Sequence, residues 1–338
     1  MLKTVAWFIK VGIAAVISLV ILSLFTFVWS HSGVHITNET GATDYKWEPN
    51  QWRATMGEGF AWMRMNADGF NNRFNLADVD HVDILLMGSS HMEAVNVSKD
   101  TNTGYLLNNH GNLGLITYNI GMSGHTIYQC VSNLNDAVKY YDPAKFIVIE
   151  TDRVLLDKGK MNEVVEETFP TISSHDSGLI YKIQKYVPCF LPLYRELDNW
   201  IAVTNNDAAT SVPGEKLECE NYEEYKTILC SFFDKIAAST EGRKVIILYQ
   251  HEISLDDDGV PKLENVDGLD VFRAECYEHN IEFIDMFDDF YKEFENNHIF
   301  AHGFTNTEVG VGHLNMTGHR LVADRLETVI KELEDGAE

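Results

Sequence analysis

Five short apolar segments, separated by stretches of helical length, constrain the fold of this chain most. They are VDILLMG (82–88), ITYNIGM (116–122), FIVIETD (146–152), KVIILYQ (244–250) and IEFIDMF (281–287). Each is continuously apolar rather than alternating, which is typical of strands that are buried on both faces of a parallel sheet. Parallel strands need long crossovers, and the intervening stretches are long enough to supply them. The sequence therefore predicts an α/β fold, a three-layer α/β/α sandwich with about five parallel strands.

The C-terminal segment predicts a helix that packs on this sheet. Its apolar residues recur at helical spacing, namely Leu321, Val322, Leu326, Val329, Ile330 and Leu333. Asn315 is suited to cap the start of this helix, which leaves His313 in the turn just before it.

The N-terminus predicts a membrane anchor. Residues 11–29 carry no charge, and at ~1.5 Å per residue they nearly match a hydrocarbon core of ~30 Å. Lys3 and Lys10 precede this run, so the positive-inside rule places the N-terminus in the cytoplasm and the rest of the chain outside the cell membrane. A cleaved signal peptide is the alternative. It is disfavoured because the apolar run exceeds a usual signal-peptide core and no A-x-A-like cleavage site follows.

The domain organisation follows from these segments. Residues 1–30 are predicted to form a cytoplasmic stub and transmembrane anchor, residues 31–80 a tether and packed lead-in, and residues 81–338 the α/β domain. Roughly ninety residues separate the third and fourth strands, too many for one crossover or a structureless loop, so a helical insertion is expected at about 155–242. Ligands bind at the carboxyl ends of parallel strands, which makes this insertion a natural place for substrate selection.

Charge and cysteine content exclude several functions. A net charge of −25 argues against nucleic acid or an anionic lipid surface as a partner, and is compatible with a neutral or carbohydrate ligand. The five cysteines are odd in number and lack CxxC spacing, so buried thiols are expected, with a Cys189–Cys219 bridge as the alternative. His302, His313 and His319 have no metal-ligand spacing, and no metal is predicted.

The stretch LLMGSSHMEAV (85–95) is the first candidate for chemistry. It has a plain interpretation as a strand that ends in a polar turn. A serine between a strand and a helix, however, exposes its hydroxyl at the edge of the sheet, and its backbone N–H can point at a developing oxyanion. The interpretation therefore depends on whether other parts of the chain provide a base and further oxyanion donors.

Three motifs in order resemble the SGNH/GDSL hydrolase superfamily: strand-GSSH, then NIGMSGHT one strand later, then GHLNMTGH before the terminal helix. The resemblance covers about residues 66–335, apart from the insertion. It is greatest to the membrane-anchored branch associated with bacterial surface polysaccharides, whose N-x-x-G-F lead-in is matched by residues 66–70.

The resemblance implies roles for residues near the first three strands. Ser90 falls on the nucleophile, while Ser89 occupies the usual aspartate position. The backbone N–H groups of Ser90 and Gly124 would form the oxyanion hole. The asparagine that usually ends the third strand is missing from IETDR, so Thr151 or Arg153 would donate instead. Asp152 is not assigned this role, because its charge would repel an oxyanion.

The last motif implies that His313 is the general base. The usual D-x-x-H pattern has Gly310 in place of the acid, so a backbone carbonyl or Glu308 would have to orient the imidazole. Further residues are expected to line the pocket, namely Ser89, His91, His302 and Asn315.

Two functions from different classes follow. The first is a membrane-anchored serine esterase or O-acyltransferase that acts without a cofactor on O-acetyl groups of a cell-surface or exported polysaccharide, with a membrane acyl donor or a polysaccharide-assembly protein as a possible partner. The sequence leaves hydrolysis and transfer open, because both pass through the same acyl-enzyme. The second, motivated by the missing acid and asparagine, is a catalytically weak or inactive protein that binds glycan or serves as a scaffold in polysaccharide assembly.

Overall fold

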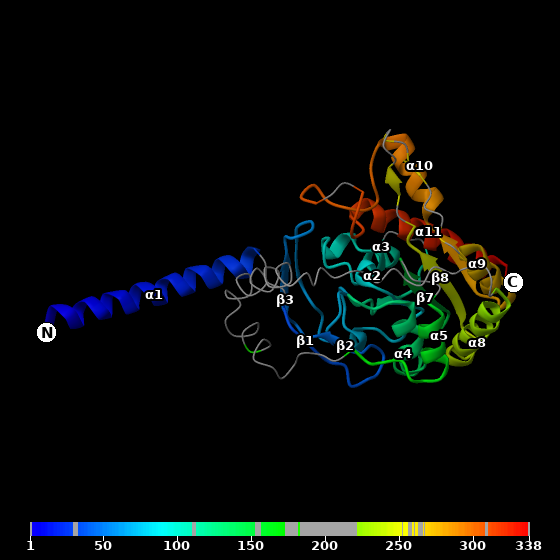
Figure 1. Ribbon diagram of the computed structural model, residues 1–338, viewed down its shortest axis with the longest axis horizontal. Helices are drawn as coiled ribbons and strands as arrows, with labels where there is room; N and C mark the ends of the chain where they lie inside the picture. Colours follow the sequence, from blue (N-terminus) through cyan, green and yellow to red (C-terminus); the bar gives the residue numbers. More distant parts are fainter. Residues whose placement is uncertain are drawn as a thin grey trace.

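The computed structural model describes residues 2–29, 33–109, 113–152, 157–172, 182, 222–251, 253–255, 259, 261–262, 266, 268–307 and 310–336. The elements follow one another from N- to C-terminus (Figure 1) as α1 (Leu2–Trp29), β1 (His35–Thr37), β2 (Tyr45–Trp47), β3 (Trp52–Thr55), β4 (Ala61–Arg64), η1 (Leu76–Asp78), β5 (Ile84–Met87), α2 (Ser90–Glu93), η2 (Lys99–Thr101), α3 (Thr103–Asn109), β6 (Thr117–Asn119), α4 (Ile127–Tyr141), β7 (Phe146–Thr151), α5 (Lys158–Val165), α8 (Tyr222–Thr240), β8 (Lys244–Tyr249), β9 (Ser254–Leu255), β10 (Pro261–Lys262), α9 (Leu269–Glu278), β11 (Glu282–Asp285), α10 (Phe287–Asn297) and α11 (Met316–Asp335).

The central sheet contains the five predicted strands. They lie in the order β11-β8-β7-β5-β6, and every neighbouring pair is parallel. Counted along the chain this is the 2-1-3-4-5 order of flavodoxin-like folds, in which ligands bind where the strand order reverses. Here the reversal surrounds β5, since Ile84 lies opposite both Thr117 of β6 and Phe146 of β7. The strand that ends in GSSH is therefore at the expected ligand position.

Helices cover both faces of the sheet, which confirms the three-layer prediction. Alternate strand residues separate into two cores: Leu85 and Ile147 pack with α4, α5, α8 and α9, whereas Ile84 and Val148 pack with α3, α10 and α11. This division explains why apolar residues occupy adjacent positions in these strands. The last helix, α11, buries four residues of the predicted stripe, including Leu326, and packs Leu321 and Leu333 partly buried against the same core.

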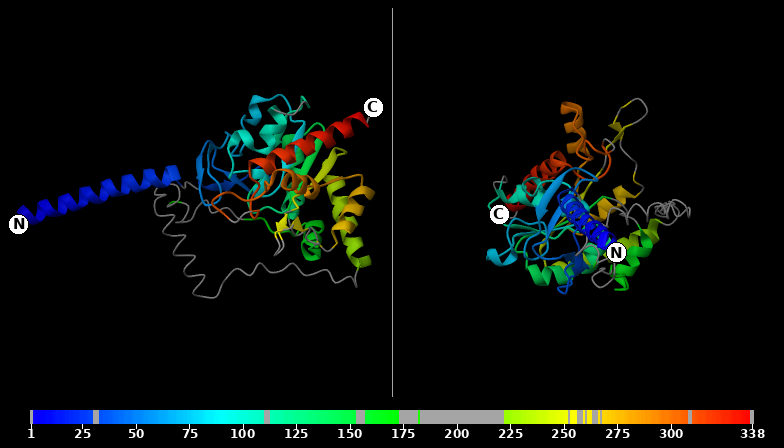
Figure 2. Two further views of the ribbon diagram at one scale, coloured as in Figure 1. Left: turned by 90° about the horizontal axis from the view of Figure 1, so that it is seen from above. Right: turned by 90° about the vertical axis from the view of Figure 1, so that its left-hand side faces the viewer.

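The lead-in is fixed to the α/β body by asparagine side chains. Asn71 Nδ2 donates to the carbonyls of Glu93 and Ala94, at 3.0 and 3.1 Å, at the end of α2. Asn72 exchanges two hydrogen bonds with the backbone of Asn119, at 2.8 and 3.0 Å. Upstream of these residues, the antiparallel pairs β1–β2 and β3–β4 lie against the same body (Figure 2).

Helix α1 extends away from the rest of the protein (Figures 1 and 2). Its segment Lys3–Phe25 has a mean hydropathy of 2.5 and is long and apolar enough to cross a membrane. An N-terminal signal sequence has the same properties, and both interpretations of the N-terminus stay predictions.

The predicted insertion is only partly described. Helices α5 and α8 lie at its two ends and pack together on the sheet. Residues 173–181 and 183–221, which include Cys189 and Cys219, lie outside the described residues. The other three cysteines, Cys130, Cys230 and Cys276, are free thiols. Burial raises the pKa of Cys130 and Cys276, as expected for structural thiols.

Candidate active site

The turn after β5 presents Ser90 at the edge of the sheet. Ser89 is the N-cap of α2, and its Oγ accepts a hydrogen bond of 3.2 Å from the His91 N–H. Ser90, the first residue of this helix, is partly exposed, and its Oγ lies 2.8 Å from His313 Nε2. A Cβ at Gly88 would lie 2.5 Å from Glu150 Oε2, so only glycine allows the turn to pack this closely.

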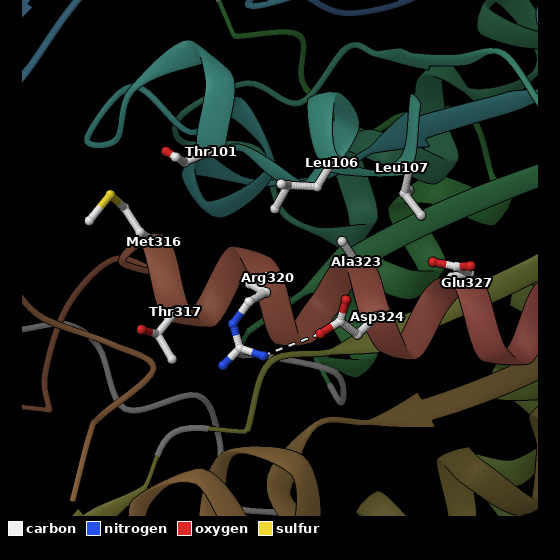
Figure 3. Close-up of a pocket in the computed structure, with 9 residues that line it drawn as sticks. All are labelled: Thr101, Leu106, Leu107, Met316, Thr317, Arg320, Ala323, Asp324 and Glu327. Atoms are coloured by element: carbon white, nitrogen blue, oxygen red, sulfur yellow. Dashed lines mark hydrogen bonds and ion pairs between the residues drawn. The ribbon is translucent and has the colours of Figure 1, made fainter. Parts of the chain in front are cut away.

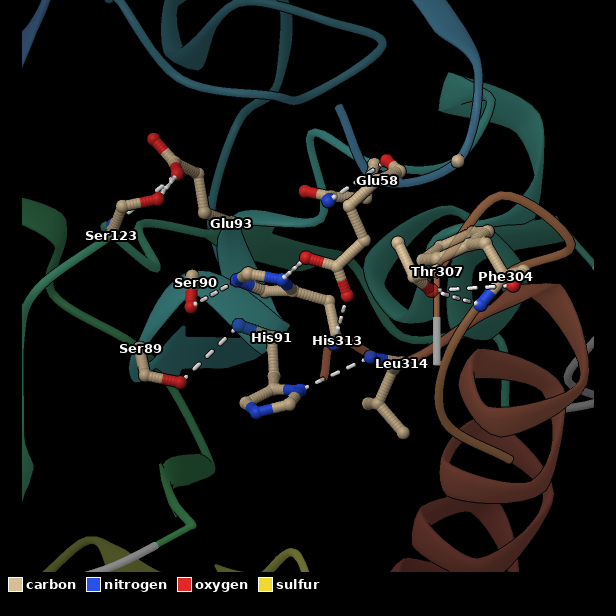
Figure 4. Close-up of polar contacts among 12 residues, drawn as sticks. Glu58, Ser89, Ser90, His91, Glu93, Ser123, Phe304, Thr307, His313 and Leu314 are labelled. Atoms are coloured by element: carbon tan, nitrogen blue, oxygen red, sulfur yellow. Dashed lines mark hydrogen bonds and ion pairs between the residues drawn. The ribbon is translucent and has the colours of Figure 1, made fainter. Parts of the chain in front are cut away.

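His313 is held between Ser90 and a carboxylate (Figure 4). Glu58 accepts two hydrogen bonds from this residue: Oε1 accepts from the backbone N–H at 2.5 Å, and Oε2 binds the ring Nδ1. A carboxylate at Nδ1 requires the proton on that nitrogen, which leaves the Nε2 lone pair facing the Ser90 hydroxyl. This is the tautomer that a general base needs.

The carboxylate of Glu58 comes from the turn between β3 and β4. Asn306 spans this turn, since its Oδ1 accepts from the Gly59 N–H at 2.9 Å and its Nδ2 donates to the Met56 carbonyl at 2.8 Å. Asn96 Nδ2 donates to the Glu58 carbonyl at 3.1 Å. The lead-in therefore supplies a residue of the site, held by side chains from two distant parts of the α/β domain.

Gly312 permits the close approach of Glu58 and His313. Its φ of +104° is in the region that favours glycine, and a Cβ here would lie 2.3 Å from Glu58 Oε1. Burial raises the pKa of Glu58, but hydrogen bonds from the His313 ring and backbone, together with the charge of that ring, outweigh it and hold the pKa below its usual value. Glu58 is thus ionised near neutral pH.

Glu308, the acid that the sequence suggested for orienting His313, lies outside the described residues, and its role stays a prediction. Among the described residues, Glu58 is the carboxylate that binds His313 Nδ1. The only sequence signal for Glu58 is its position between two glycines in MGEGF, a tight turn that projects one carboxylate.

The loop after β6 lies next to α2. The Ser123 backbone N–H donates to Glu93 Oε2 at 3.2 Å, its hydroxyl binds the same carboxylate, and Tyr45 binds its carbonyl. Gly124 follows in an exposed turn with a φ of +84°. Among the described residues, none accepts a hydrogen bond from the backbone N–H of Ser90 or Gly124. Both groups stay available as oxyanion donors.

Thr151, the third predicted oxyanion donor, is buried at the end of β7, and its role stays a prediction. Arg153, the other candidate, lies outside the described residues. Asp152 Oδ2 lies 3.4 Å from His91 Nε2.

Glu150, which the sequence analysis did not single out, binds the turn that carries Ser89 and Ser90. Its Oε2 accepts from the Ser89 N–H at 2.7 Å and from the Ser89 hydroxyl at 2.9 Å. Glu150 is fully buried, and this burial raises its pKa to about 7. Ser89 therefore points to Glu150, and the structure brings Ser90, not Ser89, to His313.

Buried histidines lie under the His313 turn. His91 Nδ1 accepts from the Leu314 N–H at 3.2 Å, which ties α2 to the segment after His313. His302 packs edge-on against the His91 ring, and burial lowers its pKa well below the usual value. His319 binds Thr103 Oγ1 at 2.9 Å, and burial lowers its pKa to about 3. His302 and His319 are therefore neutral near pH 7. No metal-binding cluster was found among the described residues.

Two grooves lie near this region. The groove between α3 and α11 (Figure 3) has a volume of about 410 Å³ and is lined by none of the predicted site residues. A second groove of about 750 Å³ adjoins the Glu58 turn. Its lining includes Gly59, Phe304 and Asn306, together with His302 and Asn315, which the sequence predicted as pocket residues. Asn315 also caps α11, as predicted, by accepting from the N–H groups of Thr317 and Gly318 at 2.9 and 3.1 Å.

Comparison with family models and with curated protein sequences gave no match. Solved structures with a similar fold include a member of the lipolytic protein G-D-S-L family from Veillonella parvula, which is 16% identical over 74% of this chain and 98% of its own, with a TM-score of 0.38. An acetyl xylan esterase is 15% identical over 74% of this chain and 100% of its own, with a TM-score of 0.40. A catalytic mutant of an acetylxylan esterase from Geobacillus stearothermophilus is 14% identical over 72% and 91%, with a TM-score of 0.37. The similarity is distant.

Proposed function

We propose that this chain is a serine esterase or O-acyltransferase of the SGNH type. One observation carries the proposal: an unbroken series of hydrogen bonds from the Glu58 carboxylate through His313 to the Ser90 hydroxyl. Nucleophile, base and orienting acid in contact are the arrangement that serine acyl transfer requires.

The mechanism follows from the positions of these groups. Ser90 Oγ attacks the ester carbonyl while its proton passes to His313 Nε2. The imidazolium that forms is stabilised by Glu58, and the N–H groups of Ser90 and Gly124 donate to the oxyanion. His313 then protonates the leaving alcohol, which leaves an acyl group on Ser90. Water or the hydroxyl of an acceptor, deprotonated by the same ring, attacks this ester and restores the serine.

For the substrate, we propose O-acyl groups, chiefly acetyl, on a cell-surface or exported polysaccharide. The motif resemblance to the membrane-anchored branch supports this class, and the charge of −25 is compatible with an uncharged glycan. The alternative of an inactive glycan-binding scaffold rested partly on the missing acid. Because Glu58 fills that position, the enzyme is the better supported of the two.

The proposal is tested with the purified full-length chain in detergent. A fluorophosphonate probe should label the wild type and Ser89→Ala but not Ser90→Ala, and p-nitrophenyl acetate hydrolysis should follow the same pattern. Equal labelling of wild type and Ser90→Ala would show that the chain is no serine hydrolase. Labelling that is lost only in Ser89→Ala would reassign the nucleophile.

We also propose that α1 anchors the protein in the cell membrane with the α/β domain outside. Protease added to intact cells should then degrade the domain and spare α1. A protected domain would contradict this orientation, and a domain released free of α1 would indicate a signal peptide.

A further inference from the structure

Large aromatic side chains lie exposed on the outer face of the β3–β4 hairpin. Trp52 is 41% and Trp62 50% exposed, and their ring centroids lie 4.9 Å apart. Phe60, in the turn between the strands, is 64% exposed. Strand residues alternate between two faces, and in β4 the neighbours Ala61 and Met63 are buried while Trp62 is not. The hairpin thus presents its apolar rings outward, where a soluble surface would normally carry polar groups.

This hairpin lies beside one end of α1. The helix contacts β3, and from that contact it runs away from the body (Figures 1 and 2). If α1 crosses a bilayer, the surface of that bilayer lies at the end of the helix where β3 and β4 are found. The position of the exposed tryptophans is therefore tied to the anchor.

The chemistry of the face suits the interfacial region of a lipid bilayer. Tryptophan has an apolar ring and a polar N–H, and it is enriched at membrane interfaces for that reason. Arg64 lies directly opposite Trp52 in the register and is exposed, so a cation accompanies the rings. The chain as a whole carries a charge of −25, so attraction to anionic lipid is not the main force. Burial of the aromatic rings in neutral lipid is the fitting interaction.

We propose that the outer face of the β3–β4 hairpin rests on the bilayer surface, and that the active site therefore acts on an O-acyl group of a glycan that a membrane lipid carries. The same hairpin connects this face to the candidate active site, because Glu58 lies in its turn, four residues before Trp62. The substrate part of this proposal rests on the proposed esterase or acyltransferase function. The docking part rests on the proposed membrane anchor α1 and on the hairpin, and not on catalysis.

Docking is measured with the full-length chain in phosphatidylcholine nanodiscs. Trp7 and Trp29 are first replaced by phenylalanine, so that α1 carries no tryptophan. Dibrominated phosphatidylcholine should then quench part of the remaining fluorescence, and Trp52→Phe with Trp62→Phe should remove that quenched part. Equal quenching with and without Trp52 and Trp62 overturns the proposal, since the rings would then face water, glycan or another protein. This result does not depend on catalysis.

The substrate is tested by comparing two esters. Trp52→Ser with Trp62→Ser should lower kcat/KM for an O-acetyl ester on the glycan of a vesicle-borne glycolipid by about tenfold. Hydrolysis of soluble p-nitrophenyl acetate should stay unchanged. Tyr277→Ser is the matched control, because Tyr277 is 57% exposed on α9, and it should affect neither reaction. A wild type that hydrolyses the soluble ester but not the glycolipid ester contradicts the glycolipid substrate alone. A wild type inactive on both contradicts the proposed function.

Discussion

Glu58 and His313 are 255 positions apart in the chain, yet both carboxylate oxygens of Glu58 bind His313, one through the backbone N–H and one through the ring. A carboxylate bound at two points cannot rotate without breaking a hydrogen bond, so the orientation of the imidazole is fixed together with that of its backbone. The hairpin turn and the turn before α11 therefore act as one unit.

Glu58→Gln should reduce kcat/KM strongly. An amide that donates its N–H to Nδ1 favours the tautomer with the proton on Nε2, which cannot accept the Ser90 proton. The corresponding change in a serine protease with a Ser-His-Asp triad lowers kcat about ten-thousandfold. Steady-state hydrolysis of p-nitrophenyl acetate measures the effect. Glu308→Gln is the control and should retain wild-type activity; a large loss in this variant with little loss in Glu58→Gln would return the role to Glu308.

Gly312→Ala should lower activity more than stability. The added Cβ would meet Glu58 Oε1 at 2.3 Å and displace the carboxylate, in addition to backbone strain of about 1–3 kcal/mol. Gly242→Ala is a matched control, because Gly242 has a φ of +83° and a Cβ there meets nothing within 4 Å. Thermal unfolding should show similar losses in both variants, whereas only Gly312→Ala should lose about tenfold or more in kcat. Equal activity of the two variants would show that the carboxylate tolerates displacement.

Asn306→Ala should reduce kcat by roughly tenfold with little change in KM. Asn306 holds both sides of the Glu58 turn, and a lost hydrogen bond costs about 1 kcal/mol. A loosened turn misplaces the acid without touching the substrate. Asn297→Ala, at an exposed position at the end of α10, is the control. A rise in KM with unchanged kcat would instead place Asn306 in substrate binding, since it also lines the neighbouring groove.

The sequence predicted the fold well because buried strands and helices have recognisable local patterns of apolar residues. Apolar residues at every position of a strand such as β5 follow directly from helices on both faces of the sheet. Ser90 and His313 were singled out by the motif resemblance, and the structure brings their side chains into contact. Glu58 was not, because it meets His313 only through the tertiary placement of a hairpin in a region with few aliphatic runs.

Glu150 shows a second limit of sequence reasoning. It is the last residue but one of the strand β7, directly before Thr151, which was considered as an oxyanion donor. A single charge at a strand end is ordinary in a sequence, since most such residues are solvated. Its full burial and its two hydrogen bonds from Ser89 become visible only when β5 and β7 are paired.

Glu150→Gln should change how stability depends on pH. Burial raises the pKa of Glu150 to about 7 from a usual 4.5. Between these two values the unfolded chain releases a proton that the folded chain retains, so this group destabilises the fold progressively as pH rises from about 4.5 to 7, and fully above that. Glutamine can still accept from Ser89 but does not titrate. The Tm of the variant relative to wild type should therefore be higher at pH 8 than at pH 5, by a few degrees, because 1 kcal/mol shifts Tm by roughly 2–4 °C in a domain of this size.

The matched control for this measurement is Glu39→Gln, since Glu39 is exposed. Its Tm relative to wild type should be the same at both pH values. Other groups, including the buried His302 and His319, contribute their own pH dependence, but they are present in every variant and cancel in the difference. A Glu150→Gln chain whose Tm difference from wild type is the same at pH 5 and pH 8 would show that Glu150 is already ionised in the folded protein at pH 5. The hydrogen bonds from Ser89 would then stabilise a carboxylate that is ionised at both pH values.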